Sequence, residues 1–198
     1  MKNEINRIAD RLVKAYNTNT VINPIPVKYC KNINLAIKLR KLCEDQIKDE
    51  TIGIKAGGTG IQALKKLKEK EPFTAKVFKK RFVKSGKSVK INQHTKGIEV
   101  EVYYFIKKSF FDFKGKVTKL NVTKFIKFMG PCFEIVGFRQ RNKKFTYLGD
   151  ICGDFGFNIK FVVGRKTKFK KLNLNNLKTS LVSRKNGVIV NGNTNIVY

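Results

Sequence analysis

The chain has few of the residues that build zinc sites. It contains no tryptophan, a single histidine (His94) and four cysteines, none of them in a Cys-x-x-Cys spacing. Structural zinc sites take four ligands from closely spaced Cys and His residues, so a site of this class is excluded. No spacing places His94 beside a cysteine either. We therefore expect Cys30, Cys43, Cys132 and Cys152 to be reduced thiols of a cytoplasmic protein.

Long apolar runs are also lacking. No stretch approaches the roughly 18 consecutive apolar residues that a membrane span requires. The N-terminal residues form a charged amphipathic pattern without the apolar segment of a signal peptide, so we predict neither secretion nor membrane insertion. A length of 198 residues and a hydrophobic content of 41% predict one domain or slightly more, with a core of its own.

Acidic residues are scarce relative to basic ones. The chain has 14 Asp and Glu against 43 Lys and Arg, a formal net charge of +29. Such a surplus usually indicates a nucleic acid or another anionic partner. The lysines are spread over the whole length, however, and no basic block interleaved with stacking aromatics stands out. We interpret the charge as compositional bias and do not expect a nucleic-acid partner. A basic nucleic-acid-binding module is the alternative of a different class.

This scarcity makes the remaining acids informative. Beyond Glu71 they are Glu99, Glu101, Asp112, Glu134, Asp150 and Asp154. Glu99 and Glu101 alternate with apolar residues at the period of a β-strand, so they point from one face about 6–7 Å apart. Glu134 lies in a second apolar run, residues 132–136, that is typical of a buried strand. An unpaired charge is costly in such places.

Three converging carboxylates need protons or a cation, because each pair repels by roughly 2–3 kcal/mol at an effective dielectric constant near 20. An all-oxygen set suits Mg²⁺, Mn²⁺ or Ca²⁺. The alternative is that Glu99 and Glu101 line the water-exposed face of a strand. A chain so rich in lysine would more readily place lysine there, so we favour the metal site.

The apolar periodicity predicts helices over residues 3–16 and 34–46. A short strand then leads through Lys55 into the Gly-rich turn 57–60, followed by a helical segment that includes Ile61, Leu64 and Leu67. The turn is not a phosphate-binding P-loop, because no Gly-Lys-Ser/Thr follows it. A lysine within a mostly apolar strand indicates a side chain that faces a site and binds an anionic group.

Downstream, strands alternate with one further helix. The run 120–129, closed by Gly130 and Pro131, predicts a helix of ten residues, and Asn186-Gly187 predicts a type I′ hairpin. The strand-like run 195–198 ends the sequence abruptly, so we expect the natural chain to extend beyond Tyr198. The predicted strands cover residues 72–78, 89–93, 98–105, 132–136, 159–163, 172–174, 179–183 and 188–190.

The order of these motifs resembles the fumarylacetoacetate hydrolase superfamily, in its branch of 2-keto-4-pentenoate hydratase and oxalocrotonate decarboxylase. The resemblance covers nearly the whole chain and depends on the order and spacing of its motifs. It implies an α+β fold with a small helical N-terminal region, residues 1–70 with the Gly-rich turn, and a mixed β-roll core, residues 71–198, incomplete at its C-terminus. One continuous domain is the alternative to this division. The matching segments are residues 53–59, Glu71-Pro72, 98–101, 131–139, the Asp154 segment as far as Gly164, and the Asn-Gly hairpin.

The resemblance also implies a site. It assigns Mg²⁺ or Mn²⁺ to Glu99, Glu101 and Glu134. It assigns catalysis to Lys55 and Asp154, and substrate contacts to Thr59 and Arg139. The implied reaction is hydration of a 2-oxo or 2-hydroxy dienoic acid such as 2-keto-4-pentenoate through a metal-chelated enolate, in aromatic-compound catabolism. A small 2-oxo acid is the implied partner, and the protein is expected to form a homo-oligomer.

Sibling chemistries of the same site remain open, because the metal ligands alone do not separate hydration from decarboxylation or from C–C bond hydrolysis. Two departures from the family pattern have consequences. The hydratases usually read Asp-Asn-Ala-Ser where this chain has Asp154-Phe155-Gly156-Phe157, which removes a polar substrate contact. The family also continues well past the position of Tyr198, and without that part the roll exposes strand edges, so the fragment is expected to be unstable or inactive alone.

Overall fold

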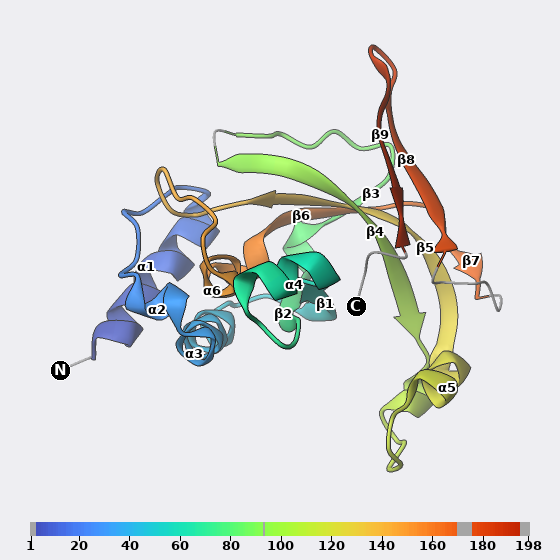
Figure 1. Cartoon of the computed structure of the whole chain (residues 1–198), viewed down its shortest axis with the longest axis horizontal. Helices are drawn as coiled ribbons and strands as arrows, with labels where there is room; N and C mark the ends of the chain where they lie inside the picture. The colour runs from blue at the N-terminus through green and yellow to red at the C-terminus, as the bar shows by residue number, and fades with distance from the viewer. Residues whose placement is uncertain (1–2, 93, 170–175, 195–198) are drawn as a thin grey trace.

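The computed structural model describes residues 3–92, 94–169 and 176–194. Four helices gather at one end of a twisted sheet, and the hairpin of β8 (Lys178–Ser183) and β9 (Gly187–Asn193) lies toward the opposite end (Figure 1). The helices of the first end are α1 (Glu4–Thr18), α2 (Lys28–Lys31), α3 (Ile33–Asp45) and α6 (Leu148–Cys152). The four cysteines are free and buried. Within the described ranges, no helix is both long enough and apolar enough to cross a membrane.

Side-chain caps start the two long helices where the sequence predicts them. The Asn3 side chain accepts a hydrogen bond from the backbone of Asn6, and Asn32 accepts from Asn34 and Leu35. Each helix buries one apolar stripe, which in α1 includes the fully buried Leu12. The predicted boundaries are therefore confirmed to within one or two residues.

The strands that the structure describes form three sheets. In the largest, the order is β3 (Phe82–Lys84), β6 (Asn158–Val163), β5 (Ile126–Gly137) and β4 (Thr95–Ile106), and β7 (Thr167–Lys168) also pairs with β5. A separate antiparallel pair joins β1 (Thr51–Gly57) to β2 (Phe73–Phe78), with α4 (Ile61–Leu67) between them in the chain. The third sheet is the hairpin of β8 (Lys178–Ser183) and β9 (Gly187–Asn193). Short helical turns occupy α5 (Lys119–Val122), η1 (Lys79–Arg81), η2 (Lys108–Phe110), η3 (Thr123–Phe125) and η4 (Phe155–Phe157).

The register of β4 against β5 decides where the acidic side chains lie. Glu99 is paired with Glu134, and Glu101 is paired with Cys132, along twelve-residue antiparallel strands. Directly opposed residues, and residues two positions apart, point to the same face of a sheet. The backbone therefore places all three glutamates on one face.

The helix predicted over residues 120–129 is wrong. Only a four-residue helix and a 3₁₀ turn form there, and β5 already begins at Ile126. The spacing of the apolar residues fits a helix, but Phe128 and Met129 pair with Phe105 and Tyr104 of β4. A complete strand partner outweighs a local helical pattern.

Two other expectations change. Residues 89–92 form no strand, Gln93 lies outside the described residues, and so does the strand predicted over residues 172–174. The predicted hairpin is confirmed, but not its turn type. A type I′ turn needs a positive φ at both central residues, but Gly187 has a φ of 69° and Asn186 has no positive φ. Ser183 pairs with Gly187, so the three residues 184–186 form the loop and Gly187 begins β9.

The hydrophobic core is continuous across the predicted domain boundary at residue 70. One cluster joins Leu12 and Leu39 of the N-terminal helices to Phe78 of β2 and Phe155 of η4. The β1–β2 pair also crosses that position. The division into residues 1–70 and 71–198 stays a prediction, and this shared core favours one unit.

Candidate metal centre

A buried ion pair joins β1 to β5. Lys55 Nζ donates to both carboxylate oxygens of Glu134, at 2.6 and 2.8 Å, and to the carbonyl oxygen of Gly156 at 3.0 Å. The side chains of Lys55 and Glu134 are only 10% and 2% exposed. Lys55 thus points from its apolar strand into a site, as its position in the sequence indicates.

Glu99 and Glu101 complete an acidic cluster around this pair. One carboxylate oxygen from each of Glu99, Glu101 and Glu134 lies within 4.8 Å of the others. Oxygens that share one divalent cation at about 2.4 Å lie up to about 4.8 Å apart, so the three side chains fit a single ion. Three carboxylates and one ammonium leave two negative charges in excess, which one divalent cation neutralises. Their role as metal ligands stays a prediction.

The surroundings work against ionisation of these acids. Burial raises the pKa of the Glu134 carboxyl to about 7; Lys55 opposes this rise, and repulsion from Glu99 and Glu101 adds to it. The residue Glu101 is exposed, yet burial of its carboxyl and the charge of Glu99 raise its pKa as well. A bound cation would relieve both the repulsion and the cost of burial, which is the electrostatic signature of an acidic metal site.

A pocket of about 260 Å³ opens beside the acidic cluster. Thr59 lines it within the Gly-rich turn, and Lys55 is the one cation among the described residues that line it. The walls are otherwise mostly glycine and apolar side chains, and Arg139 and Asp154 are not among them. The apolar wall consists of Ala56, Ala63, Leu64, Leu67, Phe145, Leu148, Ile151 and Phe157.

Glycine is required in the turn because the backbone approaches the core closely. A Cβ atom at Gly57 would lie 2.4 Å from the ring of Phe73, and one at Gly58 would lie 2.6 Å from Leu148 Cδ1. Gly58 also has a φ of +71°, which side-chain-bearing residues rarely adopt. The turn between β1 and α4 therefore packs closely against Phe73 and Leu148 where it lines the pocket.

The structure places Arg139 and Asp154 away from the pocket walls and against each other. Asp154 is fully buried and accepts hydrogen bonds from the backbone of Arg139 at 2.7 Å, from Arg139 Nη1 at 3.1 Å and from Gln140 Nε2 at 3.2 Å. Arg139 is 4% exposed. Each charge is satisfied by the other, and the catalytic role of Asp154 and the substrate contact of Arg139 stay predictions.

Sequence reasoning missed several residues of the site. The Gly156 carbonyl carries no side-chain signal, although the glycine in Asp-Phe-Gly-Phe marks a special backbone position. Leu148 and Ile151 come from the five-residue helix α6, which is too short to show a periodic pattern. Phe145 precedes it in a loop.

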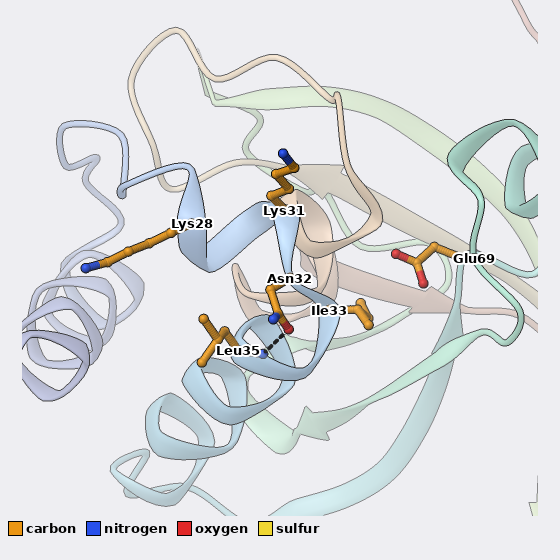
Figure 2. A pocket seen from close by; sticks show the side chains of 6 residues that line it. All are labelled: Lys28, Lys31, Asn32, Ile33, Leu35 and Glu69. Atoms are coloured by element: carbon orange, nitrogen blue, oxygen red, sulfur yellow. Dashed lines mark hydrogen bonds between the residues drawn. The ribbon is translucent and has the colours of Figure 1, made fainter.

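A second hollow of about 560 Å³ lies where α2 meets α3, with Glu69 across from it (Figure 2). Its polar side chains serve local structure: Asn32 caps α3, and Lys28 pairs with Glu4. We assign no ligand to it.

The raised pKa of Glu134 predicts how stability depends on pH in the metal-free protein. A carboxyl whose pKa is higher when folded binds protons more tightly in the folded state, so its contribution to stability falls as pH rises from about 4.5 to about 7, by about 3 kcal/mol in total. Urea unfolding in EDTA at pH 5 and pH 7.5 measures this change. In the Glu134→Gln variant, the free energy of unfolding should decrease less between these two pH values. An equal decrease in both proteins would contradict a raised pKa of Glu134.

Comparison with known proteins gives the fold. No family model matches the chain, and neither does any curated protein sequence. Among solved structures, 4-oxalocrotonate decarboxylase from Pseudomonas putida G7, complexed with magnesium and adipate, matches at a TM-score of 0.77 with 16% identity, over 98% of this chain and 74% of that chain. The same enzyme complexed with calcium and acetate matches at 0.76 with the same identity and coverage. The chain therefore has the α+β fold of 4-oxalocrotonate decarboxylase, the fumarylacetoacetate hydrolase-type fold that the order of its motifs predicted.

Proposed function

We propose that the protein is a metal-dependent enzyme that acts on a 2-oxo acid, with Mg²⁺ or Mn²⁺ held by Glu99, Glu101 and Glu134. The observation that carries this proposal is the convergence of the three carboxylates beside Lys55, at a pocket that Glu99, Glu101 and Lys55 line. The fold neighbour supports it, because its structures contain magnesium or calcium together with a carboxylate compound.

A divalent ion at this position supplies Lewis acidity that stabilises the negative charge developing on a chelating 2-oxo acid. The protein's own residues bind the substrate, transfer protons and exclude water. Lys55 Nζ lies where it can bind the substrate carboxylate or transfer a proton, and the Gly156 carbonyl orients it. The apolar wall of α4 and α6 shields the reacting end from bulk water.

Hydration of a short dienoic acid such as 2-keto-4-pentenoate is the reaction we propose first, which makes the protein a hydro-lyase. Decarboxylation is the second candidate, favoured by the identity of the fold neighbour. The pocket wall supports hydration. A substrate of the oxalocrotonate type carries a second carboxylate at its far end. Beyond Lys55, the residues of the wall that the structure describes offer that charge no cation and mostly apolar contacts. Hydrolysis of a C–C bond remains a sibling possibility.

Steady-state kinetics with Mg²⁺ test this choice. We expect kcat/KM for hydration of the monoanionic dienoate to exceed that for decarboxylation of the dianionic analogue by at least about tenfold, the cost of one poorly solvated charge. Phe145→Lys should narrow the difference by placing a cation at the rim, and Phe145→Leu is the matched neutral control. Phe145 is 51% exposed, so both variants should fold. A parent protein that prefers the dianion would contradict the proposal.

The nucleic-acid-binding alternative makes a different prediction for the acidic cluster. A polyanion binder gains nothing from the convergence of Glu99, Glu101 and Glu134. If the Glu99→Ala/Glu101→Ala variant keeps DNA binding that weakens steeply with salt, and the parent shows no metal effect, the alternative holds. Cytoplasmic location, homo-oligomeric assembly and a role in aromatic-compound catabolism remain part of our proposal.

A further inference from the structure

Three consecutive residues beside the site adopt a left-handed backbone. The φ angles are 54° at Phe155, 68° at Gly156 and 72° at Phe157. Glycine adopts this region freely, but a phenylalanine does so only against a steric cost between its Cβ atom and the following carbonyl. Two such residues in one turn persist only if the surrounding structure holds them there.

Contacts with the surrounding structure hold these residues in place, and Arg139 makes the central ones. Its guanidinium donates to Asp154 Oδ1, just before the turn, and to the Asn158 carbonyl, just after it, at 3.1 and 2.5 Å. The Asn158 side chain closes the turn by donating to the Phe155 carbonyl at 2.6 Å. One buried side chain thus clamps both ends of the turn.

Aromatic packing fixes the two phenylalanines. The ring of Phe155 lies 4.4 Å from that of Tyr16, and the ring of Phe157 lies 4.6 Å from that of Phe138, centroid to centroid. These contacts tie the turn to α1 on one side and to the end of β5 on the other. The rings thereby hold the backbone in its unfavourable conformation.

The result of this arrangement is the position of one carbonyl oxygen. Gly156 presents its oxygen 3.0 Å from Lys55 Nζ, which also contacts Glu134. Arg139 follows β5, the strand that carries Glu134, by two residues. These contacts connect the elements in a ring. Strand β5 carries Glu134 and leads to Arg139, Arg139 binds both ends of the turn that contains Gly156, and Lys55 contacts both Gly156 and Glu134.

We propose that Arg139 and Asp154 are positioning residues: through the left-handed turn they hold the Gly156 carbonyl where it fixes the Lys55 ammonium beside Glu134. The proposal explains why a buried arginine and a strained turn lie next to the pocket without lining it. Its consequence for turnover rests on the proposed function, whereas the position of Lys55 can be measured without it.

Gly156→Ala tests the proposal with a control on the strand of Lys55 itself. A Cβ atom at Gly156 would lie 2.7 Å from Ala75 Cβ, at a φ of +68°, so the turn must shift. A Cβ atom at Gly53 meets nothing within 4 Å, so Gly53→Ala leaves the turn intact. Asn158→Ala is a second test, because it deletes the hydrogen bond that closes the turn. Arg139→Lys should act in the same direction, since an ammonium cannot clamp both ends.

The readout is the rate at which Lys55 reacts with acetic anhydride in the metal-free protein, measured by peptide mass spectrometry against Lys160. We expect about tenfold faster labelling of Lys55 in Gly156→Ala and Asn158→Ala, the fold-change for losing one hydrogen bond to a charged group. Gly53→Ala should match the parent, and Lys160 should label equally in all variants. General destabilisation would accelerate both lysines, so equal acceleration of the two would overturn the proposal.

Turnover supplies the second readout. At saturating Mg²⁺ and substrate, kcat of Asn158→Ala should fall up to about a hundredfold while Mg²⁺ affinity is unchanged, as expected for a misplaced catalytic group. Unchanged labelling of Lys55 in folded Asn158→Ala would overturn the proposal, even if Gly156→Ala does not fold. If the parent neither binds metal nor turns over, but Lys55 labelling responds as expected, the proposed function fails and the positioning role stands.

Discussion

Replacing Glu134 with glutamine should weaken Mg²⁺ and Mn²⁺ binding by a hundredfold or more. Loss of a residue that merely orients a ligand typically costs about 10–100-fold in metal affinity, and loss of a charged ligand costs at least that much. Glu134 is also the most buried of the three carboxylates. Its charge therefore acts on a bound ion with the least screening by water. Calorimetric titration of the variant measures the change directly.

The matched control for this experiment is Glu71→Gln. Glu71 is an exposed glutamate just before β2 and does not line the pocket, so its loss should leave metal affinity within error of the parent. An unchanged metal affinity in Glu134→Gln would contradict the ligand assignment. A loss of affinity shared by both variants would instead indicate a general effect of net charge.

Lys55→Ala should lower turnover without lowering metal affinity, unlike Glu134→Gln. We expect kcat to fall by about a thousandfold, within the range for loss of a positioned acid–base group. Metal affinity should be unchanged or higher, because removing the ammonium leaves Glu134 without a competing cation. Steady-state kinetics at saturating metal, together with calorimetry, separate the two effects.

Lys76→Ala is the control for the lysine experiment. Lys76 lies on β2 beside the strand of Lys55, and its ammonium pairs with Asp45 at the surface. Exposed pairs of this kind contribute little, so turnover and metal affinity should both stay near the parent values. Equal losses of turnover and metal affinity in Lys55→Ala would show that Lys55 is structural, and would remove it from the proposed mechanism.

The acidic cluster could be predicted from the sequence because it depends on a local rule. Alternation puts Glu99 and Glu101 on one face, and the short apolar run around Glu134 reads as a strand in isolation. The scarcity of acids in a lysine-rich chain then makes their placement in apolar runs conspicuous. The long N-terminal helices follow from a comparable rule, a periodic apolar stripe with a polar cap.

The remaining features depend on partners that no local pattern reveals. The apolar residues around Leu120 and Phe125 have the spacing of a helical stripe, but from Ile126 onward the chain pairs with β4 as strand β5. Arg139 and Asp154 are polar residues in apolar surroundings, which fits a catalytic pair and a buried ion pair equally well. Only the fold shows that they satisfy each other.

The most direct test of the metal site is calorimetric titration of the parent protein with Mg²⁺ and Mn²⁺, with and without oxalate as a mimic of a chelating 2-oxo acid. We predict that each chain binds one ion, and more tightly when oxalate is present. Oxalate supplies oxygen ligands for the coordination positions of the ion that the three carboxylates do not occupy. A folded sample that binds neither ion would contradict the account. The three carboxylates would then have no role as metal ligands, and the basic-module alternative would take precedence.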